Sequence, residues 1–163
     1  MPGPPTSPGH RALRRGRVSL PQQAYLVTVT TPRRRALFAH FAAGRAVCSA
    51  FSASADEGDA ALLAWVLMPD HVHWLLQLGT DASLARVIAK WKAAATRAVH
   101  AQTAHTGEVW SRGFHDRALR HDEDLRAAAR YVVLNPVRAG LVARVTEYPF
   151  WDAVWLNDDG RGF

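Results

Sequence analysis

The sequence is poor in cysteine and in long apolar runs, and these two shortages exclude several classes of protein. Cys48 is the only cysteine in 163 residues, so neither an internal disulfide framework nor a cysteine-rich zinc site is available. The longest apolar run covers residues 60–69, well short of the roughly 20 residues that span a bilayer. No apolar segment typical of a secretory signal precedes residue 20. We therefore expect a cytoplasmic protein with no membrane partner.

Acidic residues are missing from the first third of the chain. Residues 1–55 hold eight arginines and no Asp or Glu, whereas residues 56–163 hold 12 basic and 14 acidic residues. The formal net charge of +6 therefore comes from the first part of the chain alone. A basic segment joined to a nearly neutral one favours a polyanionic partner, with nucleic acid as the first candidate and an anionic membrane as the second.

Composition and length predict one domain with a basic arm in front of it. Apolar residues make up 48% of the chain, which is too many for a wholly disordered protein. Residues 1–20 are rich in Pro, Gly and Arg and lack apolar periodicity, so we expect a flexible arm there. The domain is expected at residues 21–156, followed by a short tail at residues 157–163.

Apolar patterning then predicts the elements of the domain. Strand patterns cover residues 24–31, 62–68 and 71–78. Helical spacing covers residues 36–53, 83–98 and 122–136. Residues 109–120 are expected to be irregular or to form a short strand, and Pro69-Asp70 predicts a hairpin turn. The order β-α-β-β-α-(β)-α indicates an α+β fold of the ferredoxin-like, split βαβ kind with an antiparallel sheet, and it disfavours a doubly wound sheet.

A His-Val-His segment lies at the start of the third predicted strand. Residues two apart on a strand project from the same face, so His71 and His73 point one way while Val72 points the other. Two neutral imidazoles on one face can hold a divalent metal. A His-X-His pair alone is weak evidence, because two hydrogen-bonded histidines on a sheet face would give the same pattern.

Tyr131 and Asn135 are placed four residues apart on the last predicted helix. Tyr131 lies roughly 130° around the helix from the centre of its apolar stripe, so it is not expected in the buried stripe. Residues four apart share one side of a helix, and a phenol and an amide there can face one point. With a metal nearby, such a phenol could attack phosphorus. The alternatives are a surface tyrosine and, for Asn135, a cap before Pro136.

Basic residues form three groups that could contact phosphates. These groups are Arg33, Arg34 and Arg35 after the first strand; Arg86, Lys90 and Arg97 on one helix face; and Arg112, Arg117 and Arg120 before the last helix. A solvated surface would explain each group equally well. Trp110, Phe114 and His115 could stack on unpaired bases, although a core position is favoured for Trp110 and Phe114. Core positions are also expected for Trp65, Trp74 and Trp91.

Two long segments resemble a known family. "WVLMPDHVHWLLQL" at residues 65–78 and "VWSRGFHDRALRHDEDLRAAARYVVLNPVRAGLV" at residues 109–142 are similar to the single-tyrosine HUH transposases. The likeness is greatest to the REP-associated tyrosine transposases of the IS200-like class, and it covers approximately residues 22–151. One departure stands at Tyr148-Pro149-Phe150-Trp151, where family members often carry Trp-Pro-Trp-Ser, and it leaves the role of that stretch open.

The resemblance implies roles for individual residues. His71 and His73 would bind Mg²⁺ or Mn²⁺, and Asn135 would be a third metal ligand. Tyr131 would be the nucleophile that cleaves single-stranded DNA and holds the 5′ phosphate as a phosphotyrosine. The substrate would be single-stranded or hairpin DNA rather than a small molecule. The resemblance leaves open whether the protein acts as a monomer or as a homodimer.

Two other functions remain in competition with strand transfer. One is a domesticated protein that binds DNA hairpins without cutting them, and the other is a replication initiator or relaxase-like nickase with the same metal and tyrosine chemistry. Retention of His71, His73 and Tyr131 disfavours the first, and the short chain disfavours the second. We expect the basic arm to gather DNA, so deleting residues 1–20 should weaken binding more than it changes cleavage.

Overall fold

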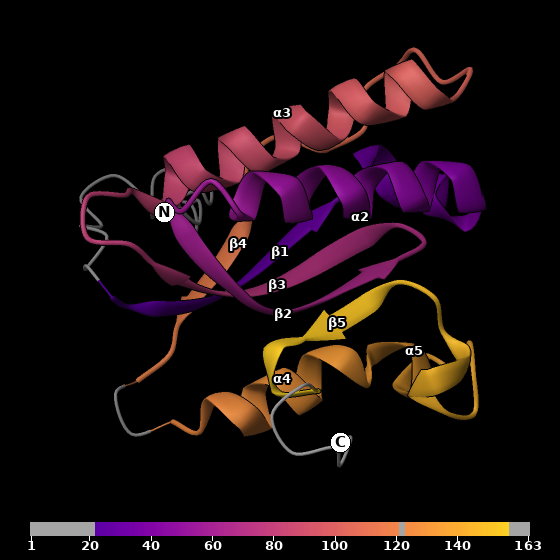
Figure 1. Ribbon diagram of the computed structural model, residues 1–163. Helices are drawn as coiled ribbons and strands as arrows, with labels where there is room; N and C mark the ends of the chain where they lie inside the picture. The colour runs from indigo at the N-terminus through magenta and orange to yellow at the C-terminus, as the bar shows by residue number, and fades with distance from the viewer. Residues whose placement is uncertain (1–21, 121–122, 157–163) are drawn as a thin grey trace, which may run out of the picture.

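The computed structural model of the chain describes residues 22–120 and 123–156. The predicted arm at residues 1–20 and the predicted tail at residues 157–163 lie outside the described residues. Within those residues, one five-stranded sheet is covered by helices on both faces (Figure 1). No helix in residues 22–120 and 123–156 combines the length and the apolar character needed to cross a membrane.

The sheet is antiparallel throughout and has the strand order β4-β1-β3-β2-β5. Its strands are β1 (Ala24–Thr30), β2 (Ala60–Met68), β3 (His71–Leu78), β4 (His115–Ala118) and β5 (Trp151–Ala153). The helix α2 (Phe41–Ala55) connects β1 to β2, which lie on either side of β3. The helix α3 (Leu84–Gln102) connects β3 to β4, which lie on either side of β1. The predicted α+β fold with a split βαβ arrangement is therefore confirmed, and β5 extends the sheet beyond β2.

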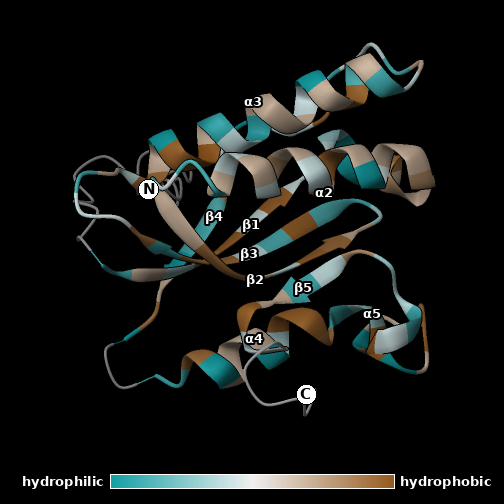
Figure 2. Cartoon of the chain, in the orientation of Figure 1, coloured by the Kyte–Doolittle hydropathy of each residue, from teal (hydrophilic) through white to brown (hydrophobic). Residues whose placement is uncertain are grey.

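Two helical layers enclose the sheet. Helices α2 (Phe41–Ala55) and α3 (Leu84–Gln102) lie side by side on one face, and α4 (Leu125–Val133) lies on the other with the short α5 (Asn135–Arg138) (Figure 1). In Figure 2 the central strands β2 and β3 are largely hydrophobic, whereas α3 and α4 each carry hydrophobic and hydrophilic residues. This amphipathic pattern is what a helix covering a sheet requires.

The face covered by α2 and α3 holds an aromatic core. Trp74 of β3 is fully buried and meets Trp91 of α3 edge to face, with ring centroids 5.3 Å apart. Phe51 of α2 contacts both Trp74 and Trp65. The predicted core positions of Trp74, Trp91 and Trp110 are confirmed, and Trp65 and Phe114 are partly buried against the same cluster. Fully burying each large apolar side chain contributes about 1.5–3 kcal/mol.

The helix predicted at residues 36–53 begins later than expected. Leu37–Ala39 form a separate 3-10 turn, and α2 starts at Phe41. The backbone N–H of Phe38 donates to the carbonyl of Pro69 at the hairpin turn (2.9 Å), and the Phe38 ring packs on Trp110. These contacts attach the segment to the β2–β3 turn and to the aromatic core.

The stretch from Tyr148 to Trp151 attaches the last strand to β2. The Tyr148 hydroxyl donates to the carbonyl of Leu67, whose own N–H donates to the carbonyl of Phe150. Phe150 is buried, and its ring lies so close to Gly44 that a Cβ there would come within 2.5 Å of it. The role that the sequence left open for this stretch is therefore packing against β2 and α2. Strand β5 was missed because three residues show no alternation.

Candidate metal and nucleophile site

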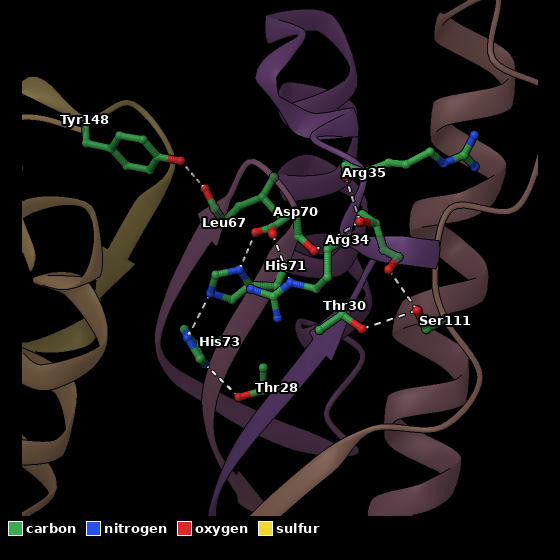
Figure 3. A network of polar contacts seen from close by, with 11 residues as sticks. Thr28, Thr30, Arg34, Arg35, Leu67, Asp70, His71, His73, Ser111 and Tyr148 are labelled. Atoms are coloured by element: carbon green, nitrogen blue, oxygen red, sulfur yellow. Dashed lines mark hydrogen bonds and ion pairs between the residues drawn. The ribbon is translucent and has the colours of Figure 1, made fainter. Parts of the chain in front are cut away.

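His71 and His73 occupy the face of β3 that is covered by α4. Val72 and Trp74 point into the aromatic core on the opposite face, so alternation along the strand places the two imidazoles on the α4 side. Their Nε2 atoms lie 3.1 Å apart, and the rings meet edge to face with centroids 4.7 Å apart (Figure 3). The prediction that both imidazoles share one face is confirmed.

Each imidazole also makes a hydrogen bond through its Nδ1 atom, which fixes the orientation of the ring. Nδ1 of His71 contacts Oδ1 of Asp70 at 2.6 Å, and Nδ1 of His73 contacts Oγ1 of Thr28 at 2.7 Å (Figure 3). Thr28 lies directly opposite His73 in the β1–β3 ladder. When the Nδ1 atoms carry the protons, both Nε2 lone pairs converge on one point. A carboxylate or hydroxyl behind the distal nitrogen is how proteins orient metal-ligating histidines.

Hydrogen bonds favour the ionised carboxylate of Asp70, and burial favours the neutral imidazole of His73. Partial burial of Asp70 opposes its ionisation, but hydrogen bonds from His71 and Arg34 outweigh it and hold the Asp70 pKa below its usual value. Burial lowers the pKa of His73 to about 3, with further lowering from the positive charges of His71, Arg138 and Arg34. A neutral imidazole is the form that binds a metal.

The two imidazole nitrogens fit a divalent cation that takes only some of its ligands from the protein. The two converging nitrogens, backed by Asp70 and Thr28, could take two coordination positions. Among residues 22–120 and 123–156, no group of three or more His, Cys, Asp and Glu could hold a metal. The remaining positions would go to an amide, to water or to phosphate oxygens, which leaves room for a substrate.

Asn135 has a different neighbour. Its amide Nδ2 donates to the carbonyl of Val132 in the last turn of α4, at 3.0 Å. This contact satisfies a carbonyl at the end of α4. It is not the cap before Pro136 that the sequence offered as the alternative, because Asn135 is the first residue of α5 and the cap position is Leu134, without a side-chain cap bond. No contact between Asn135 and either imidazole is found in the described part of the chain, so its role as a third metal ligand stays a prediction.

Tyr131 projects from α4 away from its buried stripe. Ala129, Val132 and Val133 of the same helix are fully buried, whereas Tyr131 is 59% exposed. The guanidinium of Arg138 lies over its ring, 4.0 Å from the centroid, and also donates to the Tyr131 carbonyl. The positive charge of Arg138 also contributes to the lowered pKa of His73.

Arg33, Arg34 and Arg35 follow β1 at the end of the sheet where β3 begins with His71. The Ser111 hydroxyl donates to the carbonyl of Thr31 at 2.8 Å, which brings the segment containing Arg112 beside the end of β1. Arg34 pairs with Asp70 at 2.9 Å, whereas the Arg35 side chain points away from the network (Figure 3). We call Arg33, Arg35 and Arg112 the arginine rim. All three are exposed, and none pairs with an acid in the described chain.

The remaining basic candidates have other surroundings. Lys90 pairs with Glu57 and with Asp59, and Glu123 pairs with Arg117 at 2.9 Å and with Arg120 at 3.6 Å. Arg86 and Arg97 are exposed on α3, as expected. Helix α3 packs on the sheet face opposite the histidine pair, so its basic residues lie across the sheet from the candidate site.

Three residues of the site were missed by sequence reasoning. Asp70 looked like a turn residue, although its position directly before His71 was a usable signal. Thr28 could not be assigned to His73 without the strand register. Arg138 follows the break after α4, so helical spacing from Tyr131 does not predict their contact.

Comparison with known proteins gives related sequences over most of the domain. A family model described as "Transposase IS200 like" matches residues 20–134. The REP-associated tyrosine transposase of Escherichia coli (strain K12) is 33% identical over 101 residues, which are 61% of this chain and 56% of that protein. A Haemophilus influenzae protein (strain ATCC 51907 / DSM 11121 / KW20 / Rd) is 30% identical over 112 residues, 63% of this chain and 64% of its own. The chain thus spans less than two thirds of the length of these relatives.

A solved structure supports the fold. A REP-associated tyrosine transposase bound to a REP hairpin superposes with a TM-score of 0.70 at 24% sequence identity. The match covers 83% of this chain and 79% of that chain. At this level of identity the likeness concerns the arrangement of strands and helices.

Proposed function

This chain belongs to the family of IS200-like transposases, and on that premise we propose that it is a metal-dependent endonuclease and strand transferase for single-stranded or hairpin DNA. The observation that carries the proposal is the convergence of the His71 and His73 Nε2 atoms on the α4 face, together with an exposed Tyr131 on α4. The E. coli relative is named a REP-associated tyrosine transposase, so a palindromic hairpin with single-stranded flanks is the first substrate to test.

The chemistry assigned to Tyr131 is an in-line exchange at phosphorus. Its phenol oxygen attacks the phosphorus of a phosphodiester, and the bond from phosphorus to the 3′ oxygen breaks. The protein then holds the 5′ phosphate of the DNA as a phosphotyrosine. The strand that leaves carries a free 3′-OH. Attack of another 3′-OH on the phosphotyrosine reverses these bonds, so rejoining needs no nucleotide cofactor.

His71 and His73 would hold Mg²⁺ or Mn²⁺ with their Nε2 atoms, while Asp70 and Thr28 keep the rings in place. The cation would supply positive charge to the phosphoryl oxygens of the bond being broken. The arginine rim would attract the phosphates on either side of that bond, with an affinity that falls steeply as salt is added.

Adduct formation tests the proposal against a protein that only binds hairpins. Purified protein is incubated with Mn²⁺ and a labelled hairpin carrying single-stranded flanks, and the reaction is resolved under denaturing conditions. The wild type should give a labelled protein–DNA adduct, and Tyr131→Phe should give none because the attacking oxygen is gone. Tyr25→Phe is the matched control, since Tyr25 is buried in β1 on the other face. A Tyr131→Phe protein that still forms the adduct would exclude this nucleophile.

The metal requirement is tested separately through His71. His71→Ala should abolish cleavage at all Mn²⁺ concentrations while leaving hairpin affinity within about threefold, because the imidazole acts on the phosphate and not on DNA recognition. Equal loss of binding and cleavage would indicate a structural role for His71. Wild-type cleavage that persists in EDTA would exclude the metal requirement itself.

A further inference from the structure

We propose that Arg138 is a positioning residue for Tyr131, holding the phenol ring in one orientation for attack on phosphorus. This role rests on the function proposed above. Arg138 makes two separate contacts with one residue, since its guanidinium stacks 4.0 Å over the Tyr131 ring and donates to the Tyr131 carbonyl. Both the backbone and the ring of the tyrosine are therefore held by the same side chain.

The need for such a contact follows from the exposure of Tyr131. A side chain that is 59% exposed has little packing to select one rotamer. In the described chain, the only ring contact found for Tyr131 is with Arg138. An attacking oxygen must be held near phosphorus, and a displacement of about 1 Å can cost roughly 100-fold in rate. A planar guanidinium suits this task because it stacks on a ring while its N–H groups stay free to donate.

The chain turn after α4 fixes the position of Arg138. Pro136 is buried in the first turn of α5, and the N–H of Arg138 donates to the carbonyl of Leu134 at 3.0 Å. Gly140 then adopts a φ of +73°, and the N–H of Leu141 closes the turn on the carbonyl of Pro136. This compact turn points the Arg138 side chain back along α4 toward Tyr131.

In residues 22–120 and 123–156, no acid pairs with Arg138, whereas the nearby Arg144 is held by Glu147. The Arg138 guanidinium is instead used on Tyr131, through the ring stack and the bond to the carbonyl. A more ordinary role would be to cap the carboxyl end of α4, where a cation and a donor both stabilise the last turn. The experiment must separate these two roles.

The variants are Arg138→Ala and Arg138→Lys, with Arg144→Ala as the matched control. Each is assayed for the single-turnover rate of adduct formation with saturating Mn²⁺ and hairpin, for hairpin affinity and for thermal midpoint. A positioning role predicts a 10- to 100-fold lower adduct rate for Arg138→Ala, with affinity within about threefold. Arg138→Lys, which keeps the charge and loses the planar stack, should recover only part of the rate. Arg144→Ala should match the wild type.

A second readout does not depend on activity. The chain has three tyrosines, so the ring signals of Tyr131 can be assigned in a spectrum of 13C-tyrosine-labelled protein by comparison with Tyr131→Phe. Arg138→Ala should shift and sharpen these ring signals, because the stacked cation is removed and the ring gains freedom. Arg144→Ala should leave them unchanged.

Several results would overturn the role. A lower thermal midpoint for Arg138→Ala with an unchanged adduct rate would reduce Arg138 to a helix cap, and unchanged ring signals would exclude the stack in solution. Full recovery of the rate by Arg138→Lys would show that charge alone is needed. If the wild type forms no adduct, the proposed function fails and this role falls with it, whereas an adduct formed equally fast by wild type and Arg138→Ala rejects only the role of Arg138.

Discussion

The two faces of the central sheet are built for different purposes. The face under α2 and α3 holds the Trp74 cluster and fully buried apolar side chains. The face under α4 holds a smaller apolar cluster, beside which His71 and His73 turn their nitrogens toward each other. Strand β3 contributes to both faces, because alternate residues point opposite ways. One face can therefore stabilise the fold while the other carries polar groups, which are costly to bury without partners.

Surface charge follows this division in part. On α3, over the first face, Lys90 is paired with Glu57 and Asp59, although Arg86 and Arg97 are exposed on the same helix. At the end of the sheet beside the histidine pair, the arginine rim pairs with no acid in the described chain. Arg33 and Arg34 of this end also adopt left-handed backbone angles, with φ of 54° and 55°. Strained backbone and unpaired cations at one end of a sheet are features of a binding site.

The largest contrast is expected between two aromatic residues on opposite faces. Trp74→Ala should lower the free energy of unfolding by about 3–5 kcal/mol, because a fully buried ring is replaced by a cavity. Tyr131→Phe should change it by less than about 0.5 kcal/mol, since its hydroxyl has no partner among the described residues. Urea denaturation measures both. Equal losses would mean that α4 and its tyrosine belong to the stabilising core.

A smaller loss is expected from Gly44→Ala at the contact between α2 and the β5 segment. The new Cβ would lie 2.5 Å from the Phe150 ring, so the ring must move, and such overpacking typically costs about 1–3 kcal/mol. Better helix propensity would offset up to about 1 kcal/mol of this. Repeating Gly44→Ala in a Phe150→Leu background checks the cause, because the same change should cost much less once the ring is gone. An equal cost in both backgrounds would place the strain elsewhere.

Tyr148→Phe should cost about 1 kcal/mol, the usual net value of one hydrogen bond. It should also change the alkaline limit of stability. Burial, with a smaller contribution from Cys48, raises the pKa of Tyr148 to about 12 in the folded protein. The folded state therefore keeps a proton that the unfolded state loses near pH 10, so this stabilisation is full below pH 10 and disappears as pH rises toward 12. Between pH 9 and pH 12, the free energy of unfolding should fall less steeply with pH for Tyr148→Phe than for the wild type. An identical pH dependence of the two proteins would contradict the assignment.

The smallest effects are expected from single surface charges. Arg35→Ala in the arginine rim should reduce the slope of log affinity against log salt by about 1, because one phosphate contact is lost. Lys90→Ala should leave the slope nearly unchanged, since its charge is already paired with two acids. Hairpin binding measured across a salt series gives both slopes. A larger change for Lys90→Ala would move the DNA path to the α3 side of the sheet.

Patterns within single elements were predictable from the sequence. The alternation in β3 predicted that His71 and His73 share a face, and the periodicity of α4 predicted that Tyr131 leaves the buried stripe. The helix capped by Ser83 also appears at the expected place. The start of α2 and the strand β5 were not predictable in this way, because both depend on contacts with the β2–β3 hairpin.

The sequence by itself determined the order of elements and the side of each element on which a reactive group lies, because both follow from local periodicity. Only the tertiary structure decided which groups meet. Thr28 reaches His73 through strand register, and Arg112 lies beside the end of β1 because the Ser111 hydroxyl donates to the carbonyl of Thr31. Arg138 reaches Tyr131 because the chain turns back after α4. These pairings depend on register and chain reversal, which residue spacing alone does not encode.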